Sequence, residues 1–426
     1  MPKRAFHLAS QLAAQWASPG VIEKRQLTLL QNLVQTSYKQ TTAWRCLFQR
    51  ARVRPEDIKT LQDIERLPVV RKEDLLEFTE DERTNHSVAG ANHAERIMTS
   101  GSSGAPFEFE VERIYNKWRK AQYLRPYVAN GRRPWHRMLR LTALTENDSV
   151  ARSRRGPFPE RKMNCTSDIS LQIDELRKRN PTLVQGYPSA LRCLTFELLA
   201  RQIETPYVRT VFTDSELLTP DTRALIEKAF GAPVIDIFGS FETDNIAYQC
   251  SSESDYHITT DSVIAEVFSE GGPVLERDGD LVVTVLRSRM TPFIRYNLRD
   301  QVRLLDAPCD CGRTFPLMKI VAGRSDDLIV HRDGRREPPM SLTYSMLQCS
   351  DIFREYQITQ NDIGKFTVLI VPAIPITDAT KQRIVDVIDS HYPDAEVVVR
   401  TVQKLSRTPA AKLKAFVSDV PAAHDS

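Results

Sequence analysis

The chain has 426 residues, 27% charged and 41% hydrophobic, which is enough for one large domain and a smaller one. The net charge is only +3, and this argues against a nucleic-acid-binding surface, which needs concentrated basic residues. No apolar run approaches the roughly 20 residues that span a bilayer, and polar residues interrupt the N-terminal segment where a signal peptide would be apolar. We therefore expect a cytoplasmic protein that binds neither nucleic acid nor membranes.

Hydrophobic periodicity predicts an α/β protein. Residues 1 to about 95 have leucines at helical spacing and are predicted to be largely helical, as is Tyr115 to about Leu124. Short apolar runs then alternate with helical segments between residues 183 and 238, which favours a mostly parallel sheet. Ser189 and Thr219 are predicted helix N-caps in this region.

Beyond Asp280 the pattern changes to a meander of strands, with predicted strands at 281–286 and 293–296. The C-terminal part combines strands at 366–371 and 396–399 with a helix that Thr377 caps. We expect two domains: a large N-terminal body, residues 1–323, and a small C-terminal α+β lid domain, residues 324–426.

A glycine- and serine-rich stretch precedes the alternating segment Phe107–Val111. Its glycines allow several amide N–H groups to converge on one anion, and its hydroxyls add donors. The pattern is compatible with a phosphate cradle, but a stretch of this kind on its own is more often an ordinary flexible turn. The residues of this stretch are Thr99, Ser100, Gly101, Ser102, Ser103 and Gly104.

Two acidic residues follow predicted strands. A buried run from Asp236 through Phe238 stops at Gly239, and Glu242 comes next, where a Mg²⁺-nucleotide would meet the carboxyl end of a parallel strand. Asp300 follows the second strand of the meander and has the chemistry to accept from two ribose hydroxyls. A solvated strand-end acid and an ion pair with the neighbouring arginine are the respective structural alternatives.

Two basic positions near the C-terminal domain complete the set. Arg324 lies at the domain junction, where it is suited to meet ribose or phosphate, and Asp326 is suited to act as a hinge. Lys412 lies among small residues near the C-terminus, where a mobile lysine can neutralise a phosphoryl transition state. A charged turn and a solvated tail are the alternatives.

In this order and spacing, the motifs resemble the adenylate-forming superfamily, and most closely the branch of phenylacetate-CoA ligases, capsular-biosynthesis proteins and coenzyme-F390-synthetase-like proteins. The resemblance runs from about Leu27 to Lys414. It implies that a carboxylate attacks the α-phosphate of ATP to give an acyl-adenylate and pyrophosphate. An acceptor then displaces AMP.

The resemblance also implies a role for each motif. Thr99–Gly104 would hold the β,γ-phosphates, Glu242 would bind Mg²⁺, and Lys412 would be the adenylation lysine. Asp326 would be the hinge of the small domain. The nucleoside would be held by two groups of residues: Ser215, Glu216, Asp236, Phe238 and Gly239 at the adenine, and Asp300 and Arg324 at the ribose.

Three departures from the family pattern stand out. Ala105 replaces the lysine of the phosphate loop, which leaves open whether catalysis is weakened, and Ala411 replaces the glycine before the tail lysine. The segment 332–339 differs from the one that helps the ligases to receive CoA, and this puts the CoA acceptor in doubt more than the adenylation.

The seven cysteines form no disulfide framework. Cys250 and His257 precede Cys309 and Cys311 by roughly fifty residues, and three thiolates with one imidazole make a sound tetrahedral Zn²⁺ set. With no open position evident, the zinc would be structural. Three reduced core cysteines and a surface histidine are the alternative.

The function expected is ATP-dependent activation of a small aryl or acyl carboxylic acid, followed by transfer to CoA. Transfer to an amine, sugar or carrier protein is a second hypothesis, and a non-catalytic binding member of the family is a third. The sequence identifies neither the acid nor the acceptor, and the oligomeric state is open, with a homodimer as one option.

Overall fold

The structure is a computed structural model that describes residues 2–88, 94–98, 107–144, 156–269, 272–324, 328–337, 339–408 and 411–420. The chain forms two compact units, and each is built from two stretches. The first unit consists of residues 1–131 and 237–320, and the second of residues 132–236 and 321–426.

The N-terminal part of the first unit is helical, as predicted, because its apolar residues recur at helical spacing. Among the residues the structure describes, no helix is both long and apolar enough to cross a membrane. The helices are α1 (Pro2–Ala14), α2 (Pro19–Gln40), α3 (Thr42–Arg50), α4 (Lys72–Leu76), α5 (Glu80–Arg83) and α6 (Arg113–Ala129), with short 3₁₀ turns at Pro55–Asp57 and Gln62–Arg66.

Antiparallel pairing dominates the strands of the first unit, as expected for a meander. The order across the sheet is β11-β10-β12-β13-β14-β9-β8-β7, and β1 pairs separately with β2. The strands are β1 (Glu95–Met98), β2 (Glu108–Val111), β7 (Val234–Ser240), β8 (Asp244–Gln249), β9 (Tyr256–Ile258), β10 (Val263–Ser269), β11 (Gly272–Pro273), β12 (Gly279–Val285), β13 (Tyr296–Leu305) and β14 (Leu317–Arg324).

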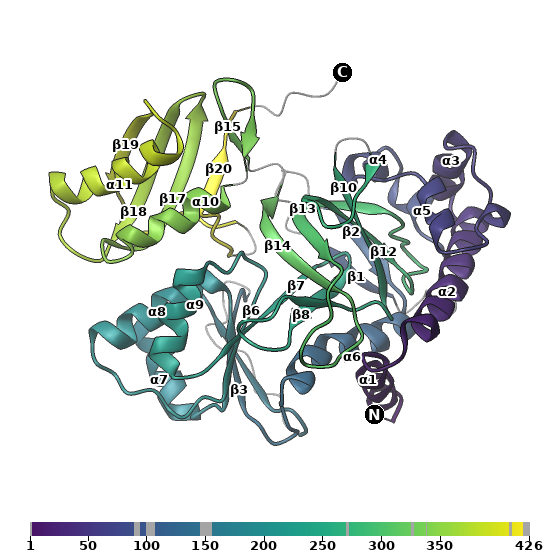
Figure 1. Cartoon of the computed structure of the whole chain (residues 1–426). Helices are drawn as coiled ribbons and strands as arrows, with labels where there is room; N and C mark the ends of the chain where they lie inside the picture. The colour runs from purple at the N-terminus through teal and green to yellow at the C-terminus, as the bar shows by residue number, and fades with distance from the viewer. Residues whose placement is uncertain are drawn as a thin grey trace. The chain divides into compact units, whose positions relative to one another are not determined.

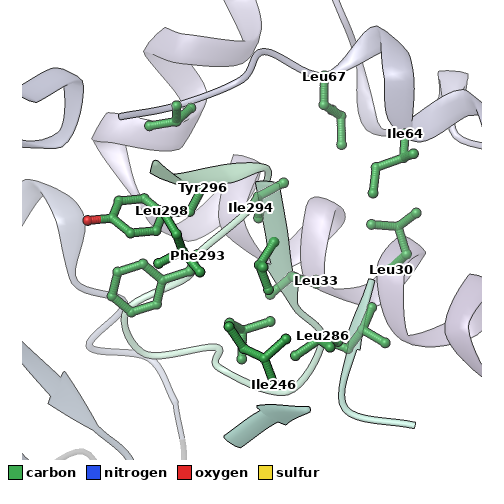
Figure 2. Close-up of a cluster of buried hydrophobic side chains, with 14 of the residues drawn as sticks. Leu30, Leu33, Ile64, Leu67, Ile246, Leu286, Phe293, Ile294, Tyr296 and Leu298 are labelled. Carbon is green, nitrogen blue, oxygen red and sulfur yellow. The ribbon is translucent and has the colours of Figure 1, made fainter. Parts of the chain in front are cut away.

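The core of this unit lies between α2 and the meander. Leu30 and Leu33 of α2 are fully buried in a cluster that contains Ile246, Leu286 and Phe293 (Figure 2). Burying one such side chain contributes about 1.5–3 kcal/mol relative to leaving it exposed. The apolar stripe of α2 thus fixes the helix against the strands.

The second unit begins with a parallel α/β segment, as predicted for residues 183–238. Parallel strands in the order β6-β5-β3-β4 all end at the same edge, and α7, α8 and α9 are connected to them (Figure 1). The elements are β3 (Met138–Thr142), β4 (Glu160–Asn164), α7 (Ile169–Arg179), β5 (Leu183–Gly186), α8 (Pro188–Ala200), β6 (Thr210–Asp214) and α9 (Pro220–Phe230).

The C-terminal part of the second unit is α+β, as predicted. Its four-stranded sheet has the order β19-β18-β17-β20 (Figure 1). Ile384 and Ile388 of α11 are buried in its core. The elements are β15 (Ile329–Val330), β16 (Arg336–Glu337), α10 (Met340–Ser345), a 3₁₀ turn (Met346–Cys349), β17 (Phe353–Asp362), β18 (Lys365–Pro372), α11 (Asp378–His391), β19 (Glu396–Thr401) and β20 (Phe416–Ser418).

Local signals located several helix ends correctly. Thr219 and Thr377 are N-caps, and α9 stops at Gly231, which has φ of 59°. The prediction for Ser189 was wrong: α8 begins two residues earlier than predicted, at Pro188, with Tyr187 as its N-cap. The fixed φ of proline suits the first helical position, so Ser189 lies inside the first turn.

A strand at 293–296 was also predicted wrongly, because β13 starts only at Tyr296. The α/β class is confirmed, with parallel pairs among β3, β4, β5 and β6 and also in the C-terminal sheet, where β17 pairs with β20 and β18 with β19. A movable domain that starts at residue 324 stays a prediction, since the compact units group this segment with residues 132–236.

One glycine in β7 is required by a close approach to β8. The register of this pair shifts between Phe238 and Gly239, and a Cβ on Gly239 would lie 2.0 Å from the carbonyl oxygen of Asp244. A backbone atom cannot yield as a flexible side chain does, so any side chain at Gly239 must displace one of the two strands.

We expect Gly239→Ala to lower the free energy of unfolding by about 1–3 kcal/mol, the usual cost of overpacking. Gly20→Ala is the matched control: nothing lies within 4 Å of a Cβ at this position in α2, so the variant is expected to be as stable as the parent or more so. Urea unfolding of both variants tests this, and equal stabilities would contradict it.

Candidate functional site: a docked lysine turn at the end of a parallel strand

The C-terminal tail of the second unit is held at the carboxyl end of β6. Glu216 follows this strand, and one of its carboxylate oxygens accepts a hydrogen bond from the backbone N–H of Leu413 (2.8 Å). The same carboxylate accepts the N–H (2.9 Å) and the hydroxyl (3.0 Å) of Ser189 at the start of α8. The residue that follows Lys412 is therefore bound to the parallel sheet.

Asp214, the last residue of β6, faces this tail. Burial raises the pKa of its carboxyl, whereas the positive charges of Arg140 and Lys412 and a hydrogen bond from Gln185 oppose the rise. Lys412 thus lies within electrostatic reach of the strand end. Two residues that the sequence analysis assigned to one site, Glu216 and Lys412, are brought together.

The backbone around Lys412 forms a tight turn. Thr408 donates its N–H to the carbonyl of Lys412 (2.9 Å), and the N–H of Lys412 donates to the Thr408 hydroxyl (3.2 Å). Ala411 has φ of 57°, the left-handed region in which glycine is the favoured residue. The turn therefore keeps the conformation that glycine would allow, although alanine occupies the position.

A cavity of about 420 Å³ borders this turn, and it is lined by Thr166, by residues 404–408 and by Ala411. Thr166 follows β4, so the cavity lies at the edge where the parallel strands end. Ligands of open α/β sheets bind at this edge, and the volume suits a small molecule.

Two residues of the predicted adenine site lie close to the end of β6. Asp236 is buried in β7, where its carboxylate accepts a hydrogen bond from the Thr213 hydroxyl. Ser215 is exposed in the turn after β6, with φ of 70°. Both residues lie near the carboxyl end of β6, and their role at adenine stays a prediction.

In the first unit, β7 turns directly into the antiparallel β8 through residues 241–243, and Glu242 lies in this turn. Its side chain is partly exposed. Asp244, two residues later, is held by an ion pair with Arg119 (2.6 Å) and by the hydroxyl of Tyr115 (3.2 Å). The turn that carries Glu242 is thus anchored to α6.

Asp300 lies within β13 rather than after a strand, contrary to the prediction. The pairing of β13 with β12 shifts register opposite Leu281, so that residues 298–300 bulge from the strand. Arg299 has φ of 61°, and its N–H donates to the Asn297 side chain (2.7 Å). A bulge redirects side chains away from the regular alternation, and Asp300 is partly exposed at this point.

Several predicted site residues lie outside the described part of the chain. These are the phosphate-loop residues Thr99–Gly104, with Ala105, and the hinge residue Asp326. The backbone of Arg324 ends β14, while its side chain is not described. Their roles stay predictions.

The four predicted metal ligands meet in the first unit, and their ligand atoms all lie within 4.8 Å of one another. The sulfur atoms of Cys250 and Cys309 are 3.6 Å apart, and the sulfur of Cys311 is 3.2 Å from Nε2 of His257. Nδ1 of His257 lies 3.2 Å from the carbonyl oxygen of Phe315, so this ring nitrogen is oriented by the backbone.

This donor set fits a tetrahedral zinc ion. Bonds of ~2.3 Å to sulfur and ~2.0 Å to nitrogen separate tetrahedral ligands by roughly 3.5–3.8 Å, close to the spacing found. Burial raises the pKa of the Cys309 thiol and lowers that of the His257 imidazole, whereas hydrogen bonds lower the pKa of Cys311 in spite of its burial. A divalent cation favours the thiolate and the neutral imidazole at such a site.

Two curated proteins of known name are similar to this chain in sequence. CapK of Staphylococcus aureus is 24% identical over 339 residues, which cover 76% of this chain and 72% of the relative. The phenylacetate-coenzyme A ligase of Pseudomonas putida is 24% identical over 372 residues, or 80% of this chain and 79% of the relative. No protein-family model matches the chain.

Among solved structures, 2-hydroxyisobutyryl-CoA ligase in complex with 2-HIB-AMP matches with a TM-score of 0.78 at 19% identity, over 94% of this chain and 90% of the other. The chain is related to the phenylacetate-CoA ligases and has the fold of the adenylate-forming enzymes.

Sequence reasoning missed the residues that hold the lysine turn of this phenylacetate-CoA ligase-like chain. Arg407 donates to the hydroxyl of Ser189 (2.9 Å) and pairs with the carboxylate of Glu355 on β17. Arg407 and Lys412 belong to the same tail motif, so a local signal in the sequence pointed to Arg407 as well. The residues that it contacts are distant in sequence, and only the folded chain reveals them.

Proposed function

We propose that this chain is an acid–CoA ligase. A carboxylate oxygen of a small acid attacks the α-phosphorus of ATP, and pyrophosphate leaves. The thiol of CoA then attacks the acyl carbonyl, loses its proton, and displaces AMP. The observation that carries this proposal is the Lys412 turn bound through Glu216 at the end of a parallel strand, in a chain related to phenylacetate-CoA ligases.

Each motif takes a role in this reaction. Lys412 supplies the positive charge for the developing charge on the α-phosphate, and Glu242 holds Mg²⁺, which when bound neutralises phosphate oxygens. Asp300 and Arg324 hold the ribose, and residues 324–426 rotate about Asp326 between the two steps. The remaining contacts are to phosphates, by Thr99–Gly104, and to adenine, by Ser215, Glu216, Asp236, Phe238 and Gly239.

The proposed reaction needs little covalent chemistry from the protein itself. Phosphoryl-type transfer depends on positioning and on neutralising charge, so a lysine and two carboxylates at fixed places suffice. The acceptor is CoA, the thiol that the names of the ligase relatives share. A cytoplasmic location and a homodimer stay predictions from the sequence.

A pyrophosphate-release screen tests the proposal. Aryl, short hydroxy, fatty and amino acids are each mixed with ATP and Mg²⁺, and hydroxylamine traps any acyl-adenylate that forms. CoA is then added to the active acids, and saturation of turnover by CoA identifies it as the acceptor. No pyrophosphate with any acid would contradict adenylation, and turnover with an amine, sugar or carrier protein in place of CoA would contradict the acceptor.

We expect Lys412→Ala to lower the rate of pyrophosphate release by on the order of 10²–10³, the usual effect of losing a positioned charge in such a site. The same variant, given a synthetic acyl-adenylate and CoA, should release AMP at nearly the parent rate. Lys414→Ala is the matched control and should leave both rates unchanged. Equal losses in both steps would contradict a lysine that serves adenylation alone.

Asp300→Ala is expected to weaken ATP and AMP binding together, because both nucleotides carry the ribose. Loss of hydrogen bonds to a charged group corresponds to roughly a 10- to 100-fold higher Kd. Isothermal titration with AMP measures it, and an unchanged affinity would remove Asp300 from the nucleotide site.

We further propose that Cys250, His257, Cys309 and Cys311 bind one structural Zn²⁺. The spacing of the ligand atoms and the oriented imidazole support this. Because all four positions of the tetrahedron are taken by protein atoms, the ion would have no open site for a substrate.

Purified protein is expected to hold one equivalent of Zn²⁺ that dialysis leaves in place. Cys309→Ser should lose the ion and unfold at a lower temperature, because structural metal binding contributes directly to folding. Cys46→Ser, at a half-buried cysteine of α3, is the control and should keep the ion. Metal-free protein whose thermal stability does not respond to strong chelation would refute the site.

A further inference from the structure

Four side chains tie the tail turn to the rest of the second unit, and we call Ser189, Glu216, Glu355 and Arg407 the latch. Its centre is the Ser189 hydroxyl, which donates to Glu216 (3.0 Å) and accepts from Arg407 (2.9 Å). The two ends of the latch come from different stretches: Ser189 and Glu216 from residues 132–236, Arg407 and Glu355 from residues 321–426.

The latch acts on the backbone of Lys412 from both sides. Glu216 accepts the N–H of Leu413, which fixes the peptide plane that follows the lysine. Arg407 donates to the carbonyl of Ala411 (3.4 Å), which belongs to the peptide plane before it. With both planes held, the direction in which the Lys412 side chain leaves the backbone is set.

The charges of the latch are removed from water. The side chains of Arg407 and Glu355 are 13% and 8% exposed. Burial raises the pKa of Glu216, and the hydrogen bonds from Ser189 and Leu413 work against this rise. A partly buried carboxylate needs such donors, so the docked tail is coupled to the ionised form of Glu216.

Two hydrogen bonds of the latch cross between the two stretches: Arg407 donates to Ser189, and Leu413 donates to Glu216. The positive charge of Arg407 also acts on Glu216 across them. Outside the latch, the Arg354–Glu197 ion pair (2.9 Å) joins the same stretches. The Arg407–Glu355 ion pair lies wholly inside residues 321–426 and can move with them. Water can replace the partners of the crossing bonds, so the latch can hold the turn and release it.

We propose that the latch positions Lys412 for adenylation and opens before the second step, an inference that rests on the proposed function. Ser189 and Arg407 are then positioning residues, since they act on the reaction only through Lys412. Loss of the latch should slow the first step and spare the second.

Two variants test the latch by kinetics. Arg407→Ala is expected to lower kcat for pyrophosphate release roughly 10- to 100-fold, the effect of losing hydrogen bonds to a charged group, with little change in the KM for ATP. AMP release from synthetic acyl-adenylate and CoA should proceed at the parent rate or faster. Arg407→Lys, which keeps a cation, should recover part of the lost kcat.

Arg383→Ala is the matched control, because Arg383 also pairs with an acid, Asp351, in residues 321–426, but at an exposed site. It should leave both steps unchanged. If Arg407→Ala slows both steps equally, or behaves like Arg383→Ala, the positioning role is wrong.

Hydrogen exchange tests the latch without any substrate. In Ser189→Ala, which removes one hydroxyl and keeps the backbone donor, the amides of residues 411–414 should exchange faster than in the parent, whereas Arg383→Ala should not change them. Unchanged exchange in Ser189→Ala would refute the latch. If instead no acid yields pyrophosphate but exchange still accelerates, the proposed reaction fails and the latch stands as a contact that holds the tail.

Discussion

The carboxylate of Glu216 joins two stretches of the second unit that are distant in sequence. Removing a carboxylate from water is costly unless donors replace the lost hydration. Two of its donors come from Ser189, whose backbone is already fixed in the first turn of α8, and the third comes from Leu413. The local fold of β6 and α8 therefore creates a preformed acceptor, and the tail turn completes it.

The tail turn also explains how the chain tolerates a departure from the family pattern. Ala411 adopts a left-handed φ, which costs an L-residue roughly 1–2 kcal/mol relative to its preferred conformations. Its methyl group packs against the hydrophobic cluster that contains Leu191 and Val211, and this burial offsets part of the cost. The turn therefore carries a backbone cost at Ala411 that a glycine at this position would avoid.

Sequence patterns predicted the structural features that depend on residues close together in the chain. The N-caps Thr219 and Thr377, the stop at Gly231 and the C-terminal α+β domain all follow from residues close in sequence. The errors at Ser189 and Asp300 also have local causes: a proline competes for the helix start, and a bulge extends the strand. The latch was beyond prediction because its hydrogen bonds join residues about 200 positions apart.

The cluster of Cys250, His257, Cys309 and Cys311 belongs to the first unit. The loop that carries Cys309 and Cys311 has no regular secondary structure, so its own backbone cannot hold it in place. Two residues of this loop, Arg313 and Thr314, nevertheless bind the end of α1. Arg313 donates to the Gln15 side chain (3.1 Å), and the backbone N–H of Thr314 donates to the carbonyl of Gln15 (2.9 Å).

Arg313 also reaches the end of α6, through the carbonyl of Ala129 (2.9 Å). One irregular loop thus joins the ends of α1 and α6. If the loop were free to move, its hydrogen bonds would stabilise neither helix end. A metal ion held by the four predicted ligands would cross-link this loop to β9 through His257 and so lower the entropy that these contacts must overcome. This is a reason to expect a structural ion at this position and not a catalytic one.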